Sequence, residues 1–193
     1  MNQQQIFQAI KNDIQNQKYT DLGIDPLYVV SKEARILIIG QAPGIKAQKS
    51  GKVWNDLSGI KLREWMGLSE TQFYNSNKIA IMPMDFYYPG QSRNGDLPPR
   101  HDFAKKWHPL LLEKMPNIEL TLLVGSYAQK EYLNLKNSQK LTDVVRNYKK
   151  YLPYYFPIVH PSPLNRRWLK KNLWFEEVVV PELKKKVRKV FEY

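Results

Sequence analysis

Four short apolar runs, separated by helical patterns, limit the possible folds of this chain more than any other feature. The runs cover residues 36–39, 79–82, 120–124 and 158–159. Each is too short for a helix of ordinary length and suits a buried strand. Between them, apolar residues recur at helical spacing around residues 62–66, 103–115 and 127–133. This alternation predicts an α/β fold with a mainly parallel sheet, whose ligand crevice lies beyond the carboxyl ends of the strands.

Length and composition fit one domain. The chain has 193 residues, of which 42% are hydrophobic, and contains neither an internal repeat nor a Gly/Ser linker. We expect a single domain over residues 1–193, with an amphipathic helix at about residues 3–16 packed on the core. The apolar face of that helix would consist of Ile6, Phe7, Ile10 and Ile14. No apolar run is long enough to span a bilayer, so we expect a soluble, cytoplasmic monomer without a membrane partner.

The charge of the chain favours a nucleic-acid partner. Lys and Arg number 30 against 18 Asp and Glu, which gives a formal net charge of +12. Such an excess is typical of proteins that meet phosphate backbones, although it also suits a charge for solubility or an anionic membrane surface. Part of the excess lies in the run at residues 184–189, which we interpret as the solvated face of a helix.

Metal and thiol chemistry find little support in the sequence. There is no cysteine, which excludes disulfides, thiolate zinc sites and cysteine-ligated iron-sulfur clusters. His101, Asp102 and His108 have the side chains of metal ligands, but their spacing suits a helix that also carries Trp107 and Leu111. We therefore expect these three residues to be structural, and we expect neither a metal nor a cofactor.

The first motif, Gly-Gln-Ala-Pro-Gly at residues 40–44, directly follows the first apolar run. Its two glycines and its proline allow a tight turn whose backbone amides can point at a ligand. An ordinary corner between a strand and a loop has the same composition. The downstream Gly51-Lys52 pair lacks the other residues of a phosphate-binding P-loop, so ATP binding by that route is not expected.

The second motif, His-Pro-Ser-Pro-Leu-Asn at residues 160–165, follows the last apolar run and precedes Arg166 and Arg167. Its two prolines stiffen a loop that presents an imidazole, an apolar tip and two guanidinium groups. A single histidine at the end of a strand is more often structural than catalytic, so this motif alone leaves both interpretations open.

Together the two motifs resemble the uracil-DNA glycosylase superfamily. Its members carry a Gly-Gln-Asp-Pro or Gly-Glu-Ala-Pro-Gly turn early in the chain and a His-Pro-Ser-Pro-Leu loop late. Residues 51–54 look like the segment that places an aromatic ring against the flipped base, and residues 122–129 look like the central strand and the helix after it. The resemblance covers about residues 34–175. It implies a three-layer α/β/α fold with a central four-stranded, mainly parallel sheet.

The resemblance also implies a function and a role for each motif. The protein would flip a nucleotide out of DNA and hydrolyse the N-glycosidic bond to uracil or a related deaminated base, as in base excision repair. His160 would donate a hydrogen bond to the base oxygen, and Leu164 would enter the base stack. Residues implied to contact DNA are Ser162, Pro163, Leu164, Asn165, Arg166 and Arg167. Residues implied to form the base pocket are Gly40, Gln41, Ala42, Pro43, Gly44, Trp54 and Met82, with Trp54 as the stacking face.

The first motif departs from the superfamily at the group that activates water. Ala42 stands where one branch has Asp, and Gln41 stands where another has Glu. Asp85 and, slightly behind it, Asp56 are the substitutes that we consider, although both residues are also typical of turns and helix caps. Residues 81–85 lack the Asn that reads uracil, and Gly44 replaces a Tyr that excludes the thymine methyl group, which leaves the preferred base open.

The sequence alone therefore leaves three functions open. The first is a DNA glycosylase, in which His160, Gln41 and one of the two aspartates are catalytic. The second is a catalytically silent, nucleic-acid-binding relative that keeps Leu164 and the basic loops. The third, more distant, is a nucleoside hydrolase or a nucleotide-binding protein on the same sheet.

Overall fold

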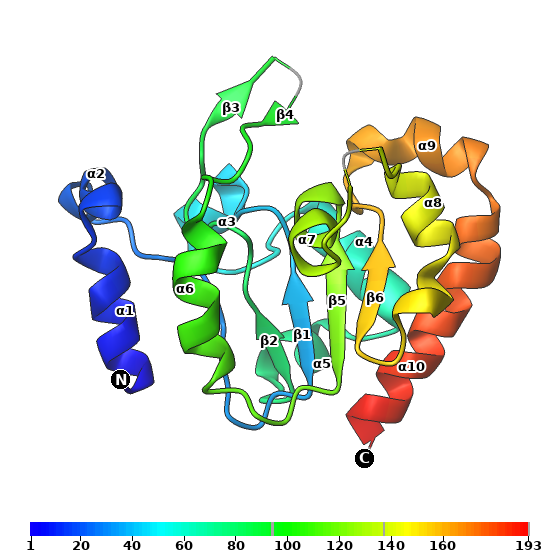
Figure 1. Cartoon of the computed structure of the whole chain (residues 1–193), viewed down its shortest axis with the longest axis horizontal. Helices are drawn as coiled ribbons and strands as arrows, with labels where there is room; N and C mark the ends of the chain where they lie inside the picture. Colours follow the sequence, from blue (N-terminus) through cyan, green and yellow to red (C-terminus); the bar gives the residue numbers. More distant parts are fainter. Residues whose placement is uncertain (94, 137, 193) are drawn as a thin grey trace.

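The computed structural model describes residues 1–93, 95–136 and 138–192. Its centre is a sheet of four parallel strands in the order β2-β1-β5-β6 (Figure 1). The strands are β1 (Ile36–Ile39), β2 (Ile79–Ile81), β5 (Leu120–Val124) and β6 (Tyr155–Ile158). All four predicted apolar runs contribute to these strands, and the prediction of a four-stranded, mainly parallel sheet is confirmed. The last strand begins three residues earlier than its apolar run, at Tyr155.

The sheet is buried on both faces. Ile36 lies opposite Ile79 on one side and Leu120 on the other, and every residue of β1 and β5 is buried. Parallel sheets covered by helices on both sides take this form, because each side chain of a strand then meets a helix layer. This is why the strands appear in the sequence as continuous apolar runs and not as alternating apolar and polar residues.

Helices cover both faces and make three layers (Figure 1). One face packs against α4 (Leu57–Met66), α5 (Glu70–Asn75), α8 (Leu141–Arg146) and α10 (Val180–Glu192). The other packs against α1 (Gln3–Lys11), α6 (Phe103–Leu112) and α7 (Ser126–Tyr132). Shorter elements are η1 (Ile14–Asn16), α2 (Gln17–Asp21), α3 (Ile45–Ser50), η2 (Tyr148–Tyr151), η3 (Pro163–Asn165), α9 (Arg166–Lys171) and η4 (Phe175–Val179). No helix in the described ranges is long and apolar enough to cross a membrane.

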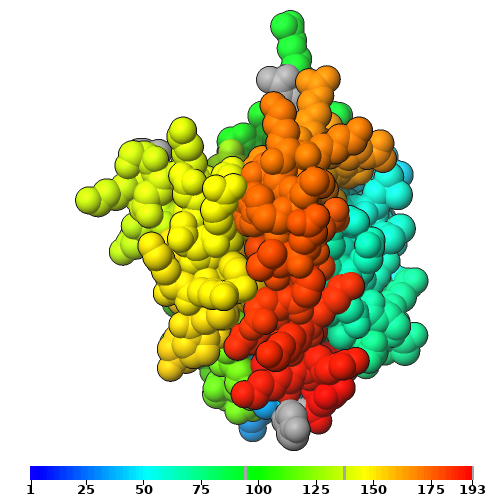
Figure 2. All heavy atoms as spheres, turned by 90° about the vertical axis from the view of Figure 1, so that its right-hand side faces the viewer, coloured from blue at the N-terminus to red at the C-terminus, as the bar shows by residue number. Residues whose placement is uncertain are grey.

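The C-terminal helix α10 closes one flank of the molecule between α8 and α4 (Figure 2). Leu183 and Val187 are buried in the core below it, whereas Lys184, Lys185 and Arg188 are exposed. An amphipathic helix that packs along one stripe leaves its charges in water. The basic run at residues 184–189 is thus the solvated helix face that the sequence predicted.

The N-terminal helix is shorter than the predicted range of residues 3–16. Helix α1 ends at Lys11, and the next turn is the 3-10 segment η1. The side chain of Asn16 donates a hydrogen bond of 2.7 Å to the carbonyl oxygen of Ile10, and Asp13 accepts one from the backbone of Gln15. Such local side-chain bonds compete with helix propagation. Ile14, expected on the packed face, is consequently 82% exposed.

His108 occupies a structural position in α6. Only 3% of the residue is exposed, its Nδ1 lies 2.6 Å from the Tyr132 hydroxyl, and its Nε2 lies 2.9 Å from the carbonyl oxygen of Pro83. These contacts fit a neutral imidazole that donates to Pro83 and accepts from Tyr132. His101, by contrast, has a side chain that is 87% exposed and contacts Asp102. Among the described residues, no three potential ligands gather into a metal-binding group.

We expect the buried His108 to make stability depend on pH. Burial lowers the pKa of His108 from 6.5 to about 4, so the folded protein stays neutral there while the unfolded chain takes up a proton. The free energy of unfolding should therefore fall as pH drops from about 6.5 to about 4, by about 1.4 kcal/mol per pH unit for this group. Urea unfolding at several pH values measures the slope. His108→Gln should reduce it and His101→Gln should not; an unchanged slope in His108→Gln would contradict the assignment.

Candidate functional site

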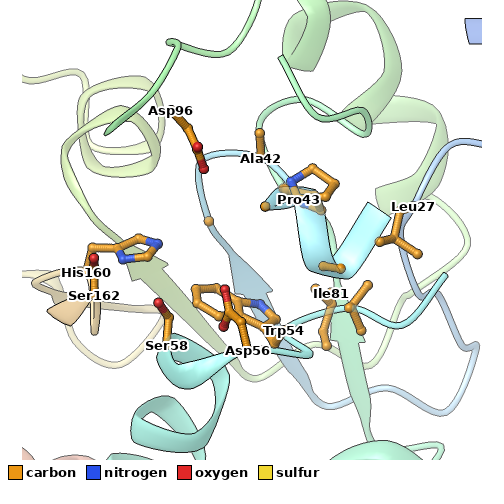
Figure 3. Close-up of a pocket in the computed structure, with 15 residues that line it drawn as sticks. Leu27, Ala42, Pro43, Trp54, Asp56, Ser58, Ile81, Asp96, His160 and Ser162 are labelled. Atoms are coloured by element: carbon orange, nitrogen blue, oxygen red, sulfur yellow. The ribbon is translucent and has the colours of Figure 1, made fainter. Parts of the chain in front are cut away.

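A cavity of about 220 Å³ opens at the carboxyl ends of the strands, between the loops that follow β1, β2 and β6 (Figure 3). This is the edge at which parallel α/β sheets bind ligands. Apolar side chains line one side, namely Leu27, Ala42, Pro43, Ala47, Val53, Ile81 and Pro83. Polar side chains line the other parts, namely Asp56, Ser58, Asp96, His160 and Ser162, together with the ring of Trp54 and the backbones of Gly40 and Gly44. The cavity therefore has an apolar part and a polar part, and the partly exposed Asp56 and the exposed Asp96 mark its mouth.

Trp54 forms one wall of the cavity, and two glycines make its position possible. A methyl group placed on Gly40 would lie 3.0 Å from the Trp54 ring, and one placed on Gly59 would lie 1.7 Å from the Trp54 carbonyl oxygen. Trp54 itself has a φ of 54°, an unfavourable angle for a bulky residue, and the hydroxyl of Tyr74 donates a hydrogen bond of 3.0 Å to its carbonyl oxygen. Strain of this kind persists where the surrounding structure fixes it, often at functional sites.

His160 faces the cavity from the end of β6. Its ring centroid lies 5.5 Å from that of Trp54, and its backbone carbonyl accepts a hydrogen bond of 2.8 Å from Asn165. Burial lowers the pKa of His160 to about 4, against a smaller opposing effect of Asp56. The imidazole is therefore neutral at pH 7. No described residue is hydrogen bonded to the ring, so a ring N–H is free for a ligand.

Asp56 lies at the mouth and also caps α4. Its Oδ1 accepts a hydrogen bond of 2.8 Å from the backbone of Gly59. Its Oδ2 faces the first motif, because a methyl group placed on Gly44 would lie 3.6 Å away. Asp56 is thus both a helix cap, through Oδ1, and a cavity residue, through Oδ2.

Asp96 reaches the same mouth from above, on a hairpin formed by β3 (Gln91–Ser92) and β4 (Gly95–Asp96) (Figure 3). Burial raises the pKa of Asp96; a hydrogen bond with the Tyr88 hydroxyl lowers it, and the charge of Asp56 raises it again. Sequence analysis did not select this residue. The available signal was the Asn-Gly pair just before it, which is typical of a hairpin turn but says nothing of where the hairpin points.

The late loop and the hairpin approach each other across the mouth. A methyl group placed on Gly95 would lie 3.6 Å from Cδ1 of Leu164. Leu164 is 75% exposed at the tip of its loop, where the Ser162 hydroxyl accepts a hydrogen bond of 3.2 Å from its backbone. Arg166 and Arg167 follow directly and are exposed. The loop therefore offers an apolar tip and two cations beside the cavity.

Comparison with known proteins identifies the family of the chain. A family model for the uracil DNA glycosylase superfamily matches residues 27–184. The chain belongs to this superfamily. A solution NMR structure of a candidate uracil DNA glycosylase from Methanosarcina acetivorans is similar, with 14% sequence identity, coverage of 86% of this chain and 96% of that chain, and a TM-score of 0.48.

Not every residue selected through the resemblance to uracil DNA glycosylases reaches the cavity. Met82 is fully buried in the core on the opposite face of the sheet, while its neighbours Ile81 and Pro83 line the cavity. Side chains alternate along a strand, so a shift of one position changes the face. Gln41 points to the hairpin instead, where its Nε2 donates a hydrogen bond of 2.9 Å to the carbonyl oxygen of Leu97.

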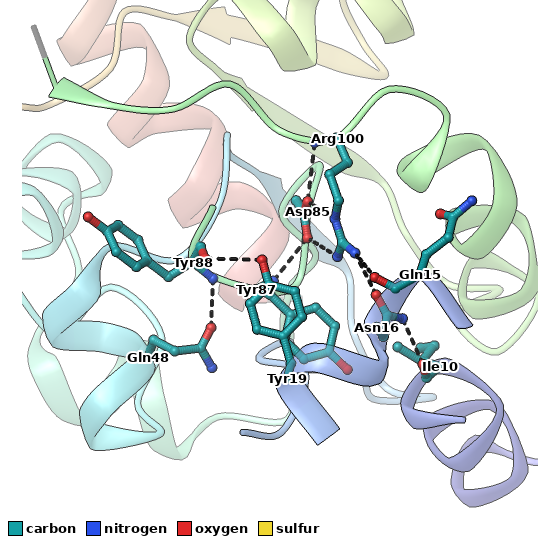
Figure 4. Close-up of polar contacts among 9 residues, drawn as sticks. All are labelled: Ile10, Gln15, Asn16, Tyr19, Gln48, Asp85, Tyr87, Tyr88 and Arg100. Carbon is teal, nitrogen blue, oxygen red and sulfur yellow. Dashed lines mark hydrogen bonds and ion pairs between the residues drawn. The ribbon is translucent and has the colours of Figure 1, made fainter. Parts of the chain in front are cut away.

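Asp85 is likewise absent from the cavity lining. It is fully buried, and both carboxylate oxygens pair with Arg100, through Nε at 2.7 Å and Nη2 at 2.8 Å (Figure 4). The Arg100 guanidinium also donates hydrogen bonds to the side chain of Asn16 and to the carbonyl oxygen of Gln15. These bonds connect the N-terminal segment to the residues that follow the β3–β4 hairpin. Of the two aspartates considered as substitutes for the glycosylase carboxylate, only Asp56 lies in the cavity.

Proposed function

We propose that this protein is a DNA glycosylase that hydrolyses the N-glycosidic bond of uracil or a related deaminated base after flipping the nucleotide out of the helix. One observation carries the proposal: the neutral His160 and the Trp54 wall share a cavity whose rim bears the exposed Leu164. Trp54 can stack on a flipped base, Leu164 can enter the base stack, and His160 can donate a hydrogen bond to the leaving base. Membership of the uracil DNA glycosylase superfamily supports the same reaction class.

The cavity suits a flipped base with its sugar at the mouth. The apolar side, with Val53 and Ile81, and the Trp54 ring would hold the planar base by packing and stacking. The neutral imidazole of His160 would donate a hydrogen bond to a base oxygen, which becomes more negative as the glycosidic bond breaks. A hydrogen bond that strengthens in this way lowers the barrier, because it binds the transition state more tightly than the substrate.

The choice of base is expected to be broad within the deaminated bases. No amide side chain is among the cavity-lining residues of the described chain, so the edge of the base would meet hydroxyl, carboxylate and backbone groups. Gly44 lines the cavity without a side chain, at a position where a bulky side chain would exclude larger bases. We therefore expect hypoxanthine or xanthine to be accepted alongside uracil or in place of it.

The test of this proposal is a cleavage assay on damaged DNA. The protein is incubated with single- and double-stranded oligonucleotides that carry uracil, hypoxanthine or xanthine, and alkali-labile abasic sites are counted. Cleavage of at least one substrate is expected. A catalytically silent relative would bind DNA in a salt-sensitive way without cleavage. The two carboxylates at the cavity mouth favour the enzyme over that alternative.

Leu164 should contribute to the binding of damaged duplex DNA. Burying this leucine in the base stack is worth about 1.5–3 kcal/mol, so Leu164→Ala should weaken binding roughly tenfold or more. Fluorescence anisotropy with a 2′-fluoro damaged nucleotide, which resists hydrolysis because fluorine disfavours positive charge at C1′, measures affinity without cleavage. Leu22→Ala is a matched control, since Leu22 is 73% exposed and Leu164 is 75% exposed. Equal affinities of the two variants would exclude the wedge.

A further inference from the structure

Two carboxylates converge on one point of the cavity mouth although neither belongs to the first motif. A methyl group placed on Gly44 would lie 3.6 Å from Oδ2 of Asp56 and 4.0 Å from Oδ2 of Asp96 (Figure 3). Asp56 comes from the start of α4 and Asp96 from the β3–β4 hairpin. If the base occupies the apolar side, the deoxyribose attached to it lies at this mouth. Among the described residues that line the cavity, these two carboxylates are then the acidic groups available to C1′.

Asp56 and Asp96 differ in their hydrogen-bond partners. Asp56 uses Oδ1 to cap α4, so one of its two oxygens is occupied by the backbone N–H of Gly59. Asp96 has no part in a helix cap, and its only described side-chain partner is the Tyr88 hydroxyl. Burial and the negative charge of Asp56 both raise the pKa of Asp96. Unlike Asp56, Asp96 is not tied to a helix terminus, and a raised pKa makes a carboxylate a better proton acceptor.

The hairpin that carries Asp96 is fastened at several points below the mouth. The backbone of Leu97 donates a hydrogen bond of 2.9 Å to the carbonyl oxygen of Gly90, and Gln41 donates another of 2.9 Å to the carbonyl oxygen of Leu97. Just beyond, Arg100 is locked onto the buried Asp85 (Figure 4). The residue at the position of the missing motif carboxylate, Gln41, thus holds the segment that brings a different carboxylate to the site.

We propose, on the basis of the glycosylase function above, that Asp96 is the residue that accepts the proton of the attacking water. In this step the water oxygen bonds to C1′ while the bond between C1′ and the base nitrogen breaks, and its electron pair leaves with the base. One water proton passes to the Asp96 carboxylate. His160 stabilises the negative charge on the base oxygen, and the base then takes a proton from solvent. The Asp56 carboxylate stabilises the positive charge that develops on the sugar.

Single-turnover kinetics of Asp96→Asn test this assignment on whichever damaged duplex the wild-type protein cleaves. Asn has the shape of Asp but cannot accept the proton, so the rate of base release should fall by about 10²- to 10⁴-fold while DNA affinity stays the same. Asp96 is exposed as a residue and its carboxylate is only partly desolvated by the cavity mouth, so neither Asn nor Ala leaves a fully buried polar group there, and Asp96→Ala should lose activity to a similar extent. Both variants should unfold at the wild-type temperature.

Two further variants separate this assignment from its competitors. Asp102→Asn removes the same charge from an exposed carboxylate outside the cavity, and its rate should equal that of the wild type. Asp56→Asn keeps a good helix cap and should cost much less than Asp96→Asn. The assignment is overturned if Asp96→Asn stays within a few-fold of the wild-type rate, or if it changes DNA affinity rather than rate. A wild-type protein that cleaves no damaged DNA would instead refute the glycosylase function itself.

Discussion

Replacing His160 by Ala is expected to slow base release by about 10²- to 10³-fold, the usual cost of removing one preorganised hydrogen-bond donor from a developing negative charge. The imidazole faces the cavity and, in the described chain, makes no hydrogen bond with the protein. Its loss should therefore affect the transition state more than the bound substrate. The rate constant of a single turnover on damaged duplex DNA measures the effect directly.

The matched control for this change is His101→Ala. His101 has a side chain that is 87% exposed and lies outside the cavity lining, so its removal should leave the rate unchanged. Anisotropy should show the same DNA affinity for His160→Ala as for the wild type. A normal rate in His160→Ala would remove His160 from the reaction, and a lower affinity with a normal rate would make it a binding residue only.

Replacing Arg100 by Met should destabilise the fold by about 3–5 kcal/mol, because it leaves the buried carboxylate of Asp85 without its partner. Asp85 is fully buried, and Arg100 supplies three of its hydrogen bonds. One of the three comes from the Arg100 backbone and survives the change. Urea denaturation gives the free energy of unfolding of the variant and of the wild-type protein.

A surface ion pair provides the comparison for Arg100→Met. Arg35 and Glu119 pair near the protein surface, with side chains that are 21% and 48% exposed, so Arg35→Met should cost no more than about 1 kcal/mol. Adding Asp85→Asn to Arg100→Met should recover part of the lost stability, since the buried charge is then gone. Similar losses in Arg35→Met and Arg100→Met would contradict the buried pair as an anchor of the hairpin.

The parts of the fold set by local patterns were accessible from the sequence. Strands such as β5 appear as apolar runs in the sequence because both of their faces are buried. The Gly40–Gly44 turn and His160 were expected at one edge because the carboxyl ends of parallel strands share it, whereas Trp54 was assigned to the pocket only through the resemblance to the superfamily. The end of α1 was not accessible, because it depends on hydrogen bonds of Asp13 and Asn16 that compete with the helix.

The positions of Asp85 and Asp96 could not be predicted from the sequence. Asp85 lies just past the second strand, which made it a candidate, but Arg100, fifteen residues later, forms an ion pair with it in the core. Asp96 belongs to a polar hairpin with no apolar pattern, and only the folded chain brings it opposite Gly44. A buried ion pair decides the first case and the position of the hairpin over Gly44 decides the second, and neither leaves a periodic signal in the sequence.

The central claim is that this cavity hydrolyses a glycosidic bond in DNA, and the release of free base tests it most directly. The protein is incubated with duplexes that carry uracil, hypoxanthine or xanthine, and both the free base and the abasic sites are quantified, with free nucleosides assayed in parallel. We predict equal amounts of base and abasic site from at least one duplex, almost none from His160→Ala, and no action on nucleosides. Absence of base release from all three duplexes, or release from nucleosides that Leu164→Ala does not alter, would contradict the claim.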